Sequence, residues 1–173
     1  MNDASTTTIH PALRARRGLR EQARQILDGR RYAVLGTEND DGSVHLAPVM
    51  FLLHNERILI ETAAATRKAR NVAARRHASV LVQTPDAAWA FGSGPATIVR
   101  GAEANGLNER IRDKYLTEHG QRACGDLLAE LDDITIVVTP TRWLGWDMTG
   151  LLENLAARGA DLDQVETWFR SDE

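Results

Sequence analysis

The chain of 173 residues is organised around the stretch from Glu56 to Gln83, which reads ERILIETAAATRKARNVAARRHASVLVQ. Apolar and polar residues alternate with a period of two near its beginning and again at its end, which predicts strands over 57–62 and 78–83. Between them, the small and apolar residues that recur among cations predict a helix over 63–76. We therefore expect a strand, a helix and a second strand in the middle of the chain.

The start of this helix carries an unusual set of side chains. Thr62 and Thr66 supply hydroxyls, Arg67 and Lys68 supply cations, and Asn71 supplies an amide. A helix N-terminus offers unpaired backbone N–H groups and the positive end of the helix dipole, so it favours an anion and disfavours a cation. The pattern thus indicates a phosphate-binding site. The alternative is that these cations form the solvated face of an amphipathic helix.

Length and composition are typical of one globular domain, because 43% of the residues are hydrophobic and 26% are charged. The longest apolar run, 47–53, is far too short to cross a bilayer, so no membrane segment is expected. No signal pattern opens the chain, and the single cysteine, Cys124, allows no internal disulfide. We expect a cytoplasmic protein. The net charge of −3 argues against a nucleic-acid partner.

The remaining elements follow from turn residues and periodicity. The sequence predicts a frayed tail at 1–10, a helix at 11–29, a strand at 32–38, a hairpin turn at Asn39–Gly42 and a return strand at 43–53, which is apolar on both faces from Ala47 onward. Further along we expect a segment at 88–104 with a strand bent at Gly92–Pro95, helices at 109–119 and 122–131 with Asn105 as an N-cap, strands at 134–139 and 143–148, and a helix at 151–170 that is broken at Gly159. This order predicts a single domain, mainly β with flanking helices, whose six or seven antiparallel strands at 32–148 form a barrel-like sheet.

The sequence lacks the motifs of most catalytic sites. It contains no nucleophile elbow, no Walker loop, no dinucleotide fingerprint and no zinc-binding spacing. The five histidines do not have the spacing of metal ligands, so no metal site is expected and the catalytic residues are unknown. An anion site without an evident acid, base or nucleophile suits a cofactor that supplies its own reactivity.

In order and spacing, the elements resemble the split-barrel flavin and deazaflavin oxidoreductases related to pyridoxamine 5'-phosphate oxidase. The matching segments are Val34–Thr37, the turn at Asp41–Gly42, the strand His45–Phe51, Thr66–Lys68 followed by Asn71, and Val99–Glu103, which is taken as a strand. The resemblance covers most of 32–146. It implies an FMN-binding type of split β-barrel and a homodimer with two cofactor sites at its interface, which agrees with a strand that is apolar on both faces.

The resemblance also implies roles for individual residues. Lys68, with Thr66 and Arg67, would hold the cofactor phosphate, and Asn71 would brace the loop or reach the phosphate. The backbone of Ala47, Pro48 and Val49 would run past the isoalloxazine-type ring, Thr62 would lie on the same wall, and Trp89 and Trp146 would border the ring or the substrate pocket. Ordinary core or interface packing explains both tryptophans equally well.

Two cofactors suit this pattern. The segment Lys68–Val72 is similar to the Lys-x-x-Asn-apolar pattern of the deazaflavin (F420) branch, and the acidic ending at 170–173 departs from the basic C-terminal segment of pyridoxamine 5'-phosphate oxidase itself. We therefore expect an F420-dependent reductase that delivers hydride to an unsaturated small molecule, with an FMN-dependent reductase as the alternative.

Two rivals belong to other functional classes. One is a module that binds flavin or haem without turnover, in which His45, His54 or His77 would be needed as the axial ligand of a haem. The other is a barrel that binds nucleic acid through its arginines. The acidic net charge and the lack of an aromatic stacking platform disfavour the nucleic-acid barrel.

Overall fold

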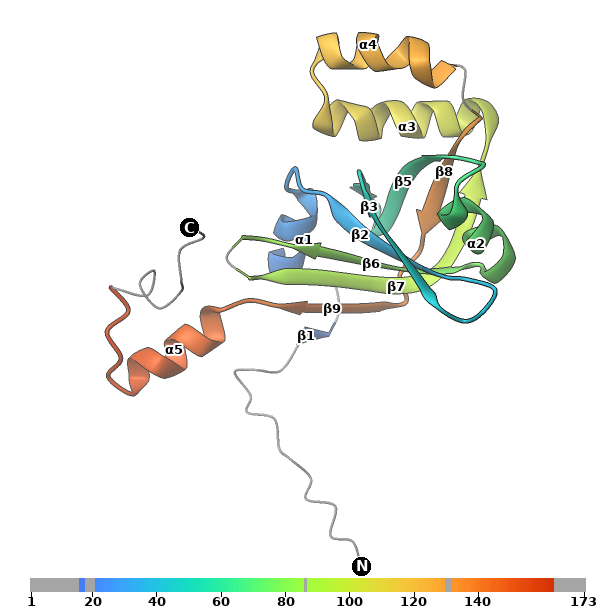
Figure 1. The fold of residues 1–173 in the computed structure, drawn as a ribbon. Helices are drawn as coiled ribbons and strands as arrows, with labels where there is room; N and C mark the ends of the chain where they lie inside the picture. The colour runs from blue at the N-terminus through green and yellow to red at the C-terminus, as the bar shows by residue number, and fades with distance from the viewer. Residues whose placement is uncertain (1–15, 18–20, 86, 130–131, 164–173) are drawn as a thin grey trace, which may run out of the picture.

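The computed structural model describes residues 16–17, 21–85, 87–129 and 132–163, and these form one curved antiparallel sheet with flanking helices (Figure 1). The helices are α1 (Glu21–Asp28), α2 (Arg67–Arg75), α3 (Gly101–Tyr115), α4 (Glu118–Ala129) and α5 (Thr149–Ala157). The strands are β1 (Arg16–Arg17), β2 (Ala33–Glu38), β3 (Val44–Val49), β4 (Leu52–His54), β5 (Arg57–Ala63), β6 (His77–Gln83), β7 (Trp89–Val99), β8 (Asp133–Val138) and β9 (Arg142–Trp146).

Strand β7 belongs to both halves of the sheet. The strand order is β3-β2-β6-β7-β8-β5-β4, and β9 pairs with β7 and with β1. One edge of β7 pairs with β6, whereas the other edge is divided between β9, at 89–93, and β8, at 96–99. This division separates the two halves and gives a split barrel. The predicted fold class is confirmed. The described strands outnumber the predicted six or seven, because the count includes the very short β1 and β4.

The division of β7 depends on glycine. The chain from Thr139 to Thr141 crosses the edge of β7 at Gly94, and the amide of Thr139 donates to the carbonyl of Pro95 (2.8 Å). A Cβ atom at Gly94 would overlap the Thr139 carbonyl oxygen and would lie 2.7 Å from the Thr141 nitrogen. The predicted interruption at Gly92–Pro95 is therefore a site where another stretch of backbone passes close to a continuous strand. Glycine inside a strand often marks such a close approach.

The main core fills the inside of the curved sheet, where α1 and α2 contribute Leu27 and Val72. Helix α3 covers the other face of β5 and β8, where Ile111 packs against Leu59 and Val137. Figure 1 shows α3 and α4 side by side beyond this part of the sheet. Within the described part of the chain, no helix is long and apolar enough to span a membrane.

The N-terminal half departs from prediction at three places. Within the predicted helix 11–29, Arg16–Arg17 instead pair with β9, and α1 begins only at Glu21. The predicted return strand 43–53 is broken at 50–51, where the chain passes from one half of the sheet to the other. At this break, Tyr115 Oη accepts a hydrogen bond from the Phe51 amide (3.2 Å) and donates to the Phe51 carbonyl (3.1 Å). The predicted helix 63–76 begins at Arg67, because Ala63 still pairs with Asp133. The tail at 1–10 lies outside the described residues.

The C-terminal half departs at α3. The segment Val99–Glu103 is not a strand, because Gly101, at φ +66°, turns the chain from β7 directly into α3. Asn105 lies inside this helix and does not cap it, since Ala104, Asn108 and Ile111 recur at helical spacing and pack on the sheet. The expected break at Gly159 agrees with α5, which ends at Ala157; residues 164–170 of the predicted last helix lie outside the described residues.

A polar cluster lies between α3 and the sheet. The Glu61 side chain on β5 is only 7% exposed, its Oε1 lies 3.4 Å from Arg112 Nε on α3, and neither carboxylate oxygen accepts a hydrogen bond from a described residue. Burial raises the pKa of Glu61 to about 7 although Arg112 opposes the rise, and Asp133 adds to it. Beside this pair, Thr135 Oγ1 donates to Asn108 Oδ1 (2.6 Å).

Replacing Gly94 by alanine tests the close passage. We expect Gly94→Ala to lower the free energy of unfolding by about 3 kcal/mol or to prevent folding, because the added methyl group meets backbone that cannot move aside. Gly106→Ala in α3 is the control: its Cβ meets nothing within 4 Å, so its effect should be within about 1 kcal/mol. Urea unfolding measures both, and equal stability of the two variants would contradict the role given to Gly94.

The buried Glu61 predicts a pH dependence of stability. Its pKa in the folded chain lies above the ordinary glutamate value of 4.5, so the folded state holds the proton more tightly and stability falls as pH rises from about 5 through about 7. The loss should reach about 2–3 kcal/mol. Glu61→Gln should flatten urea-unfolding free energies over this range, whereas the exposed control Glu56→Gln should keep the slope. An unchanged slope in Glu61→Gln would show that other groups cause it.

Candidate functional site

The predicted anion site lies at the tight turn between β5 and α2. The Ala64 amide donates to the Asp132 carbonyl (2.8 Å), and the Thr66 amide donates to the Ala63 carbonyl (3.1 Å). Thr66 takes the N-cap position in an extended conformation, but its side chain does not cap its own helix. Its hydroxyl donates to the Ala63 carbonyl (2.9 Å) and lies 3.2 Å from Thr62 Oγ1. The two hydroxyls therefore meet at the start of α2.

The charges at this helix start are not compensated from within the helix. The first turn of α2 contains no acidic residue, and the backbone N–H groups of Arg67, Lys68 and Ala69 have no acceptor inside the helix. Lys68 is half-buried and forms no hydrogen bond or ion pair with any described residue. Burial lowers the pKa of Lys68, because its charge is partly removed from water. An anion placed here would be stabilised by the cation and by the helix terminus.

Arg67 and Arg70 face a hollow of about 500 Å³ between α2 and the turn after β2. Asn39, Asp40 and Asp41 of that turn line its other side. The pKa of Asp41 is lowered chiefly by hydrogen bonds from the Ser43 hydroxyl (2.6 Å) and amide (2.9 Å), with a smaller contribution from Arg67. This acidic turn partly balances Arg67, whereas Lys68 has no counter-ion among the described residues.

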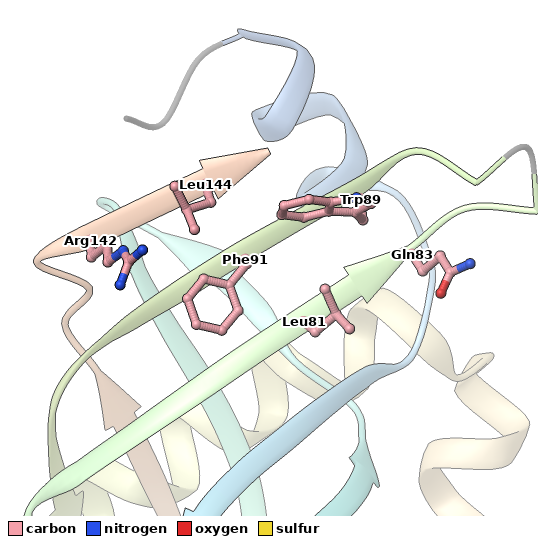
Figure 2. A pocket seen from close by; sticks show the side chains of 6 residues that line it. All are labelled: Leu81, Gln83, Trp89, Phe91, Arg142 and Leu144. Carbon is pink, nitrogen blue, oxygen red and sulfur yellow. The ribbon is translucent and has the colours of Figure 1, made fainter. Parts of the chain in front are cut away.

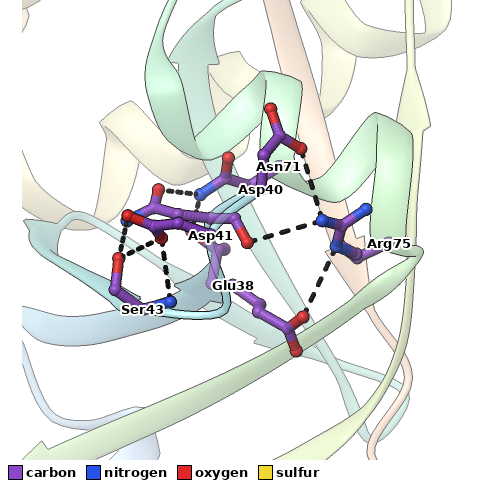
Figure 3. A network of polar contacts seen from close by, with 8 residues as sticks. Glu38, Asp40, Asp41, Ser43, Asn71 and Arg75 are labelled. Atoms are coloured by element: carbon purple, nitrogen blue, oxygen red, sulfur yellow. Dashed lines mark hydrogen bonds and ion pairs between the residues drawn. The ribbon is translucent and has the colours of Figure 1, made fainter.

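Asn71 connects α2 to the turn between β2 and β3 (Figure 3). Its side-chain nitrogen donates to Thr37 Oγ1 (3.1 Å) and to Asn39 Oδ1 (2.9 Å). One turn further along the helix, Arg75 pairs with Glu38 (3.5 Å) and with Asp40 (3.3 Å). Of the two roles predicted for Asn71, these contacts supply the bracing one, because both amide protons are used within the chain.

The predicted wall of the cofactor ring lies on β3, which is an edge strand of the described sheet. Pro48 pairs with Val34 of β2, and Ala47 and Val49 flank it. The opposite edge of β3 pairs with no described strand, so its backbone groups are available to a ligand. Thr62 is buried at the end of β5, and α2 packs against β2 and β3. The structure thus brings the β3 residues and the α2 residues to the same part of the sheet.

The two predicted tryptophans lie elsewhere. Trp89 and Trp146 are partners in the pairing of β7 with β9, and Trp89 also pairs with Gln83, the last residue of β6. Helix α2 leads into His77 at the other end of β6, roughly 20 Å away for a strand of this length. The structure therefore places the two tryptophans at the end of β6 and β7 that lies away from the end of α2.

Comparison with known proteins identifies the family. The family model described as "Pyridoxamine 5'-phosphate oxidase" matches residues 19–147. The chain belongs to the pyridoxamine 5'-phosphate oxidase family. The match spans α1 to β9 and so includes both the start of α2 and the edge of β3. No curated protein sequence matches the chain significantly.

Solved structures share the fold of this family member. The conserved hypothetical protein Rv2991 from Mycobacterium tuberculosis is 22% identical, with a TM-score of 0.67 over 80% of this chain and 91% of that one. A protein described as "F420 Reductase" is also 22% identical, with a TM-score of 0.58 over 72% and 98% of the two chains. HutZ, described as the heme storage protein from Vibrio cholerae, is 14% identical, with a TM-score of 0.59 over 73% and 95%. At these identities the similarity shows the fold alone.

An apolar groove on the outer face of the sheet was missed from the sequence (Figure 2). It has a volume of about 460 Å³ and is lined by side chains of β6, β7 and β9: Leu81, Gln83, Trp89, Phe91, Arg142 and Leu144. The sequence shows no apolar stripe there, because Leu81 stands between the polar residues Ser79 and Gln83 on the outer face of β6. Strand register extends it into a row of five strands, since Pro48 pairs with Val34, Val34 with Leu81, Leu81 with Phe91, and Phe91 with Leu144.

The bracing role of Asn71 predicts a stability effect. Asn71→Ala removes both hydrogen bonds and leaves the buried Thr37 hydroxyl without its donor, so we expect a loss of about 2 kcal/mol in the free energy of unfolding. For a chain of this size, the melting temperature should fall by about 4–8 °C. The exposed Asn105→Ala is the control and should be nearly neutral. Equal melting temperatures for both variants would contradict the bracing role.

Proposed function

We propose that this protein is an oxidoreductase that binds a phosphate-bearing flavin-type cofactor, with F420 as the preferred one, and reduces an unsaturated small organic molecule. The observation that carries the proposal is the half-buried Lys68, a cation that has no counter-ion among the described residues and lies beside a helix N-terminus without a side-chain cap. The cofactor, when bound, would supply the hydride chemistry. The chain would supply a phosphate site at Thr66, Arg67 and Lys68 and a backbone edge on β3 for the ring.

Two further points support F420 over FMN. A structural neighbour of this fold is described as an F420 reductase, and Lys68–Val72 has the Lys-x-x-Asn-apolar pattern. The structure gives a physical reason for that spacing. Lys68 lies in the first turn of α2, and Asn71 lies three residues later, where it holds the neighbouring turn in place. FMN is the alternative, because its phosphate would suit the same cations.

A second candidate function is a module that carries flavin or haem without turnover. It is favoured by the fold similarity to HutZ, a heme storage protein. Two of the three candidate haem ligands contact other side chains: His54 Nδ1 lies 3.1 Å from Arg110 Nη2, and His77 Nε2 lies 3.4 Å from Ser93 Oγ. The third, His45, is half-buried on β3. No cluster of three potential metal ligands occurs in the described residues. A Soret band in the haem-loaded protein would favour this candidate.

We also propose that two copies pair through the outer face of the sheet, with the cofactor at the seam. The five-strand apolar row supports this pairing, because Val34 and Leu81 are each 37% exposed and Leu46, nearby on β3, is 63% exposed. Apolar side chains that gather on one exposed face often mark an interaction surface. The free edge of β3 lies beside this face, so a second copy could close the open side of the ring site.

Lys68→Ala tests the phosphate site. Loss of a charged hydrogen bond to phosphate should weaken cofactor binding about 10- to 100-fold while leaving the melting temperature of the free protein nearly unchanged. Cofactor-free protein is titrated in parallel with FMN and with F420, and binding is followed by fluorescence. Arg57→Ala is the control, because it removes the same charge from the exposed far end of β5.

The titration separates the alternatives. Tight binding of F420 alone supports the proposed reductase, and tight binding of FMN alone supports the alternative cofactor. Unchanged affinity in Lys68→Ala would show that the anion site is placed wrongly. If neither cofactor binds, the oxidoreductase proposal fails.

A further inference from the structure

The groove on the outer face of β6, β7 and β9 has an apolar body and a polar end (Figure 2). Its body consists of Leu81, Phe91 and Leu144, which are neighbours in the pairing of these strands. Two residues away along β7 and β9, Ser93 pairs with Arg142. Both point to the same face as the body, because side chains two apart in a strand lie on the same side. The groove is therefore amphipathic along its length.

The polar end is suited to an anion. Arg142 is exposed and forms no hydrogen bond or ion pair with any described residue. Beside it, Ser93 Oγ lies 2.9 Å from Ser79 Oγ and 3.4 Å from His77 Nε2, so one of the two hydroxyl protons remains for His77 or a ligand. None of the six described residues that line the groove is acidic. A guanidinium beside a hydroxyl can bind a carboxylate through charge-assisted hydrogen bonds.

The dimensions of the groove suit a small organic molecule. Its volume of about 460 Å³ lies within the range of ligand pockets, roughly 300–1,000 Å³. From Ser93 to Trp89, at the other end of the groove, the distance along β7 is about 13 Å. Phe91 and Trp89 are half-buried and would offer aromatic surface to a flat ring. The groove thus has room for a carboxylate joined to one ring by a short chain.

We propose that this groove binds an organic acid with a flat apolar body, whose carboxylate lies at Arg142 and Ser93 and whose body lies on Phe91 and Leu144. The acid would be the unsaturated molecule that is reduced in the proposed function, on which this inference rests. The groove is a separate site from the phosphate site, because Lys68 lies at the start of α2 and does not line it.

The proposed pairing of two copies is compatible with this site. The most exposed apolar residues near the groove, Leu46 and Val34, lie on β3 and β2, whereas Phe91 and Leu144 are already half-buried. A second copy that packs on β2 and β3 would therefore lie beside the groove and would shield a bound molecule from water.

Calorimetric titration of the cofactor-free protein tests the acid site. Cinnamate is the probe, cinnamamide is its neutral match, and acetate carries the carboxylate without the apolar body. Cinnamate should bind at least about tenfold more tightly than either, because a charged hydrogen bond and apolar burial both contribute. Absence of cinnamate binding, or equal affinity for cinnamate and one of the other two, would overturn the proposed class of ligand.

Variants locate the carboxylate. Arg142→Gln should weaken cinnamate binding about 10- to 100-fold and leave cinnamamide binding nearly unchanged. Its melting temperature should equal that of the unmodified protein, because Arg142 has no described partner to lose. The control Arg57→Gln removes an exposed arginine from β5 and should bind cinnamate normally. Weaker cinnamate binding in Lys68→Ala but not in Arg142→Gln would place the acid at the phosphate site and overturn the groove site.

The two titrations separate the acid site from the oxidoreductase proposal. If F420 or FMN binds and cinnamate does not, the oxidoreductase proposal stands and the acid site fails. If cinnamate binds through Arg142 and neither cofactor binds, the acid site stands, and its role as the substrate site fails together with the oxidoreductase proposal.

Discussion

The passage of residues 139–141 across β7 at Gly94 is the constraint on which the rest of the structure depends. It allows β8 and β9 to use the same edge of β7 in succession, and the amides of Thr139 and Thr141 keep bonding to Pro95 and Ser93 as the chain crosses. Since β5 pairs with β8 and β2 pairs with β6, this one crossing sets the two halves of the sheet relative to each other. It thereby fixes where β5 delivers the chain into α2.

The candidate site follows from that geometry and has an energetic cost. Strand β5 ends at a turn held by Asp132, and the next residues place Thr66 and Lys68 at a helix start without an acidic partner. A carboxylate there would stabilise the free protein by up to about 1 kcal/mol. The neighbouring turn does carry acids, but Ser43 holds Asp41 and Arg75 holds Asp40. The local contacts therefore leave Lys68 uncompensated, as expected where stability is given up for ligand binding.

Local patterns in the sequence predicted much of the fold and less of the site. The sequence predicted β2, β5, β6 and β8 correctly. Strands β2 and β6 alternate in burial because one face lies in the core, whereas β5 and β8 are buried on both faces, since α3 covers their other side. The start of α3 was wrong because Asn105 and Gly106 are poor helix formers, and packing of Ile111 on the sheet overrides that preference. The break at 50–51 depends on Tyr115, more than sixty residues away, and no local pattern contains it. The separation of Trp89 from α2 depends on register between distant strands, which the sequence does not display.

Two surfaces of this chain lack a partner, and they lack it for different physical reasons. The start of α2 has excess positive charge, which a small anion can balance, whereas the outer row has exposed apolar side chains, which only a large surface can cover. An anion stabilises whichever chain binds it, but apolar cover requires association. Cofactor binding and chain pairing are therefore driven by different interactions. Both involve the free edge of β3, next to the row that begins at Pro48. A cofactor bound at that edge, between two copies, would favour pairing. Pairing would then raise the affinity for the cofactor by the same factor.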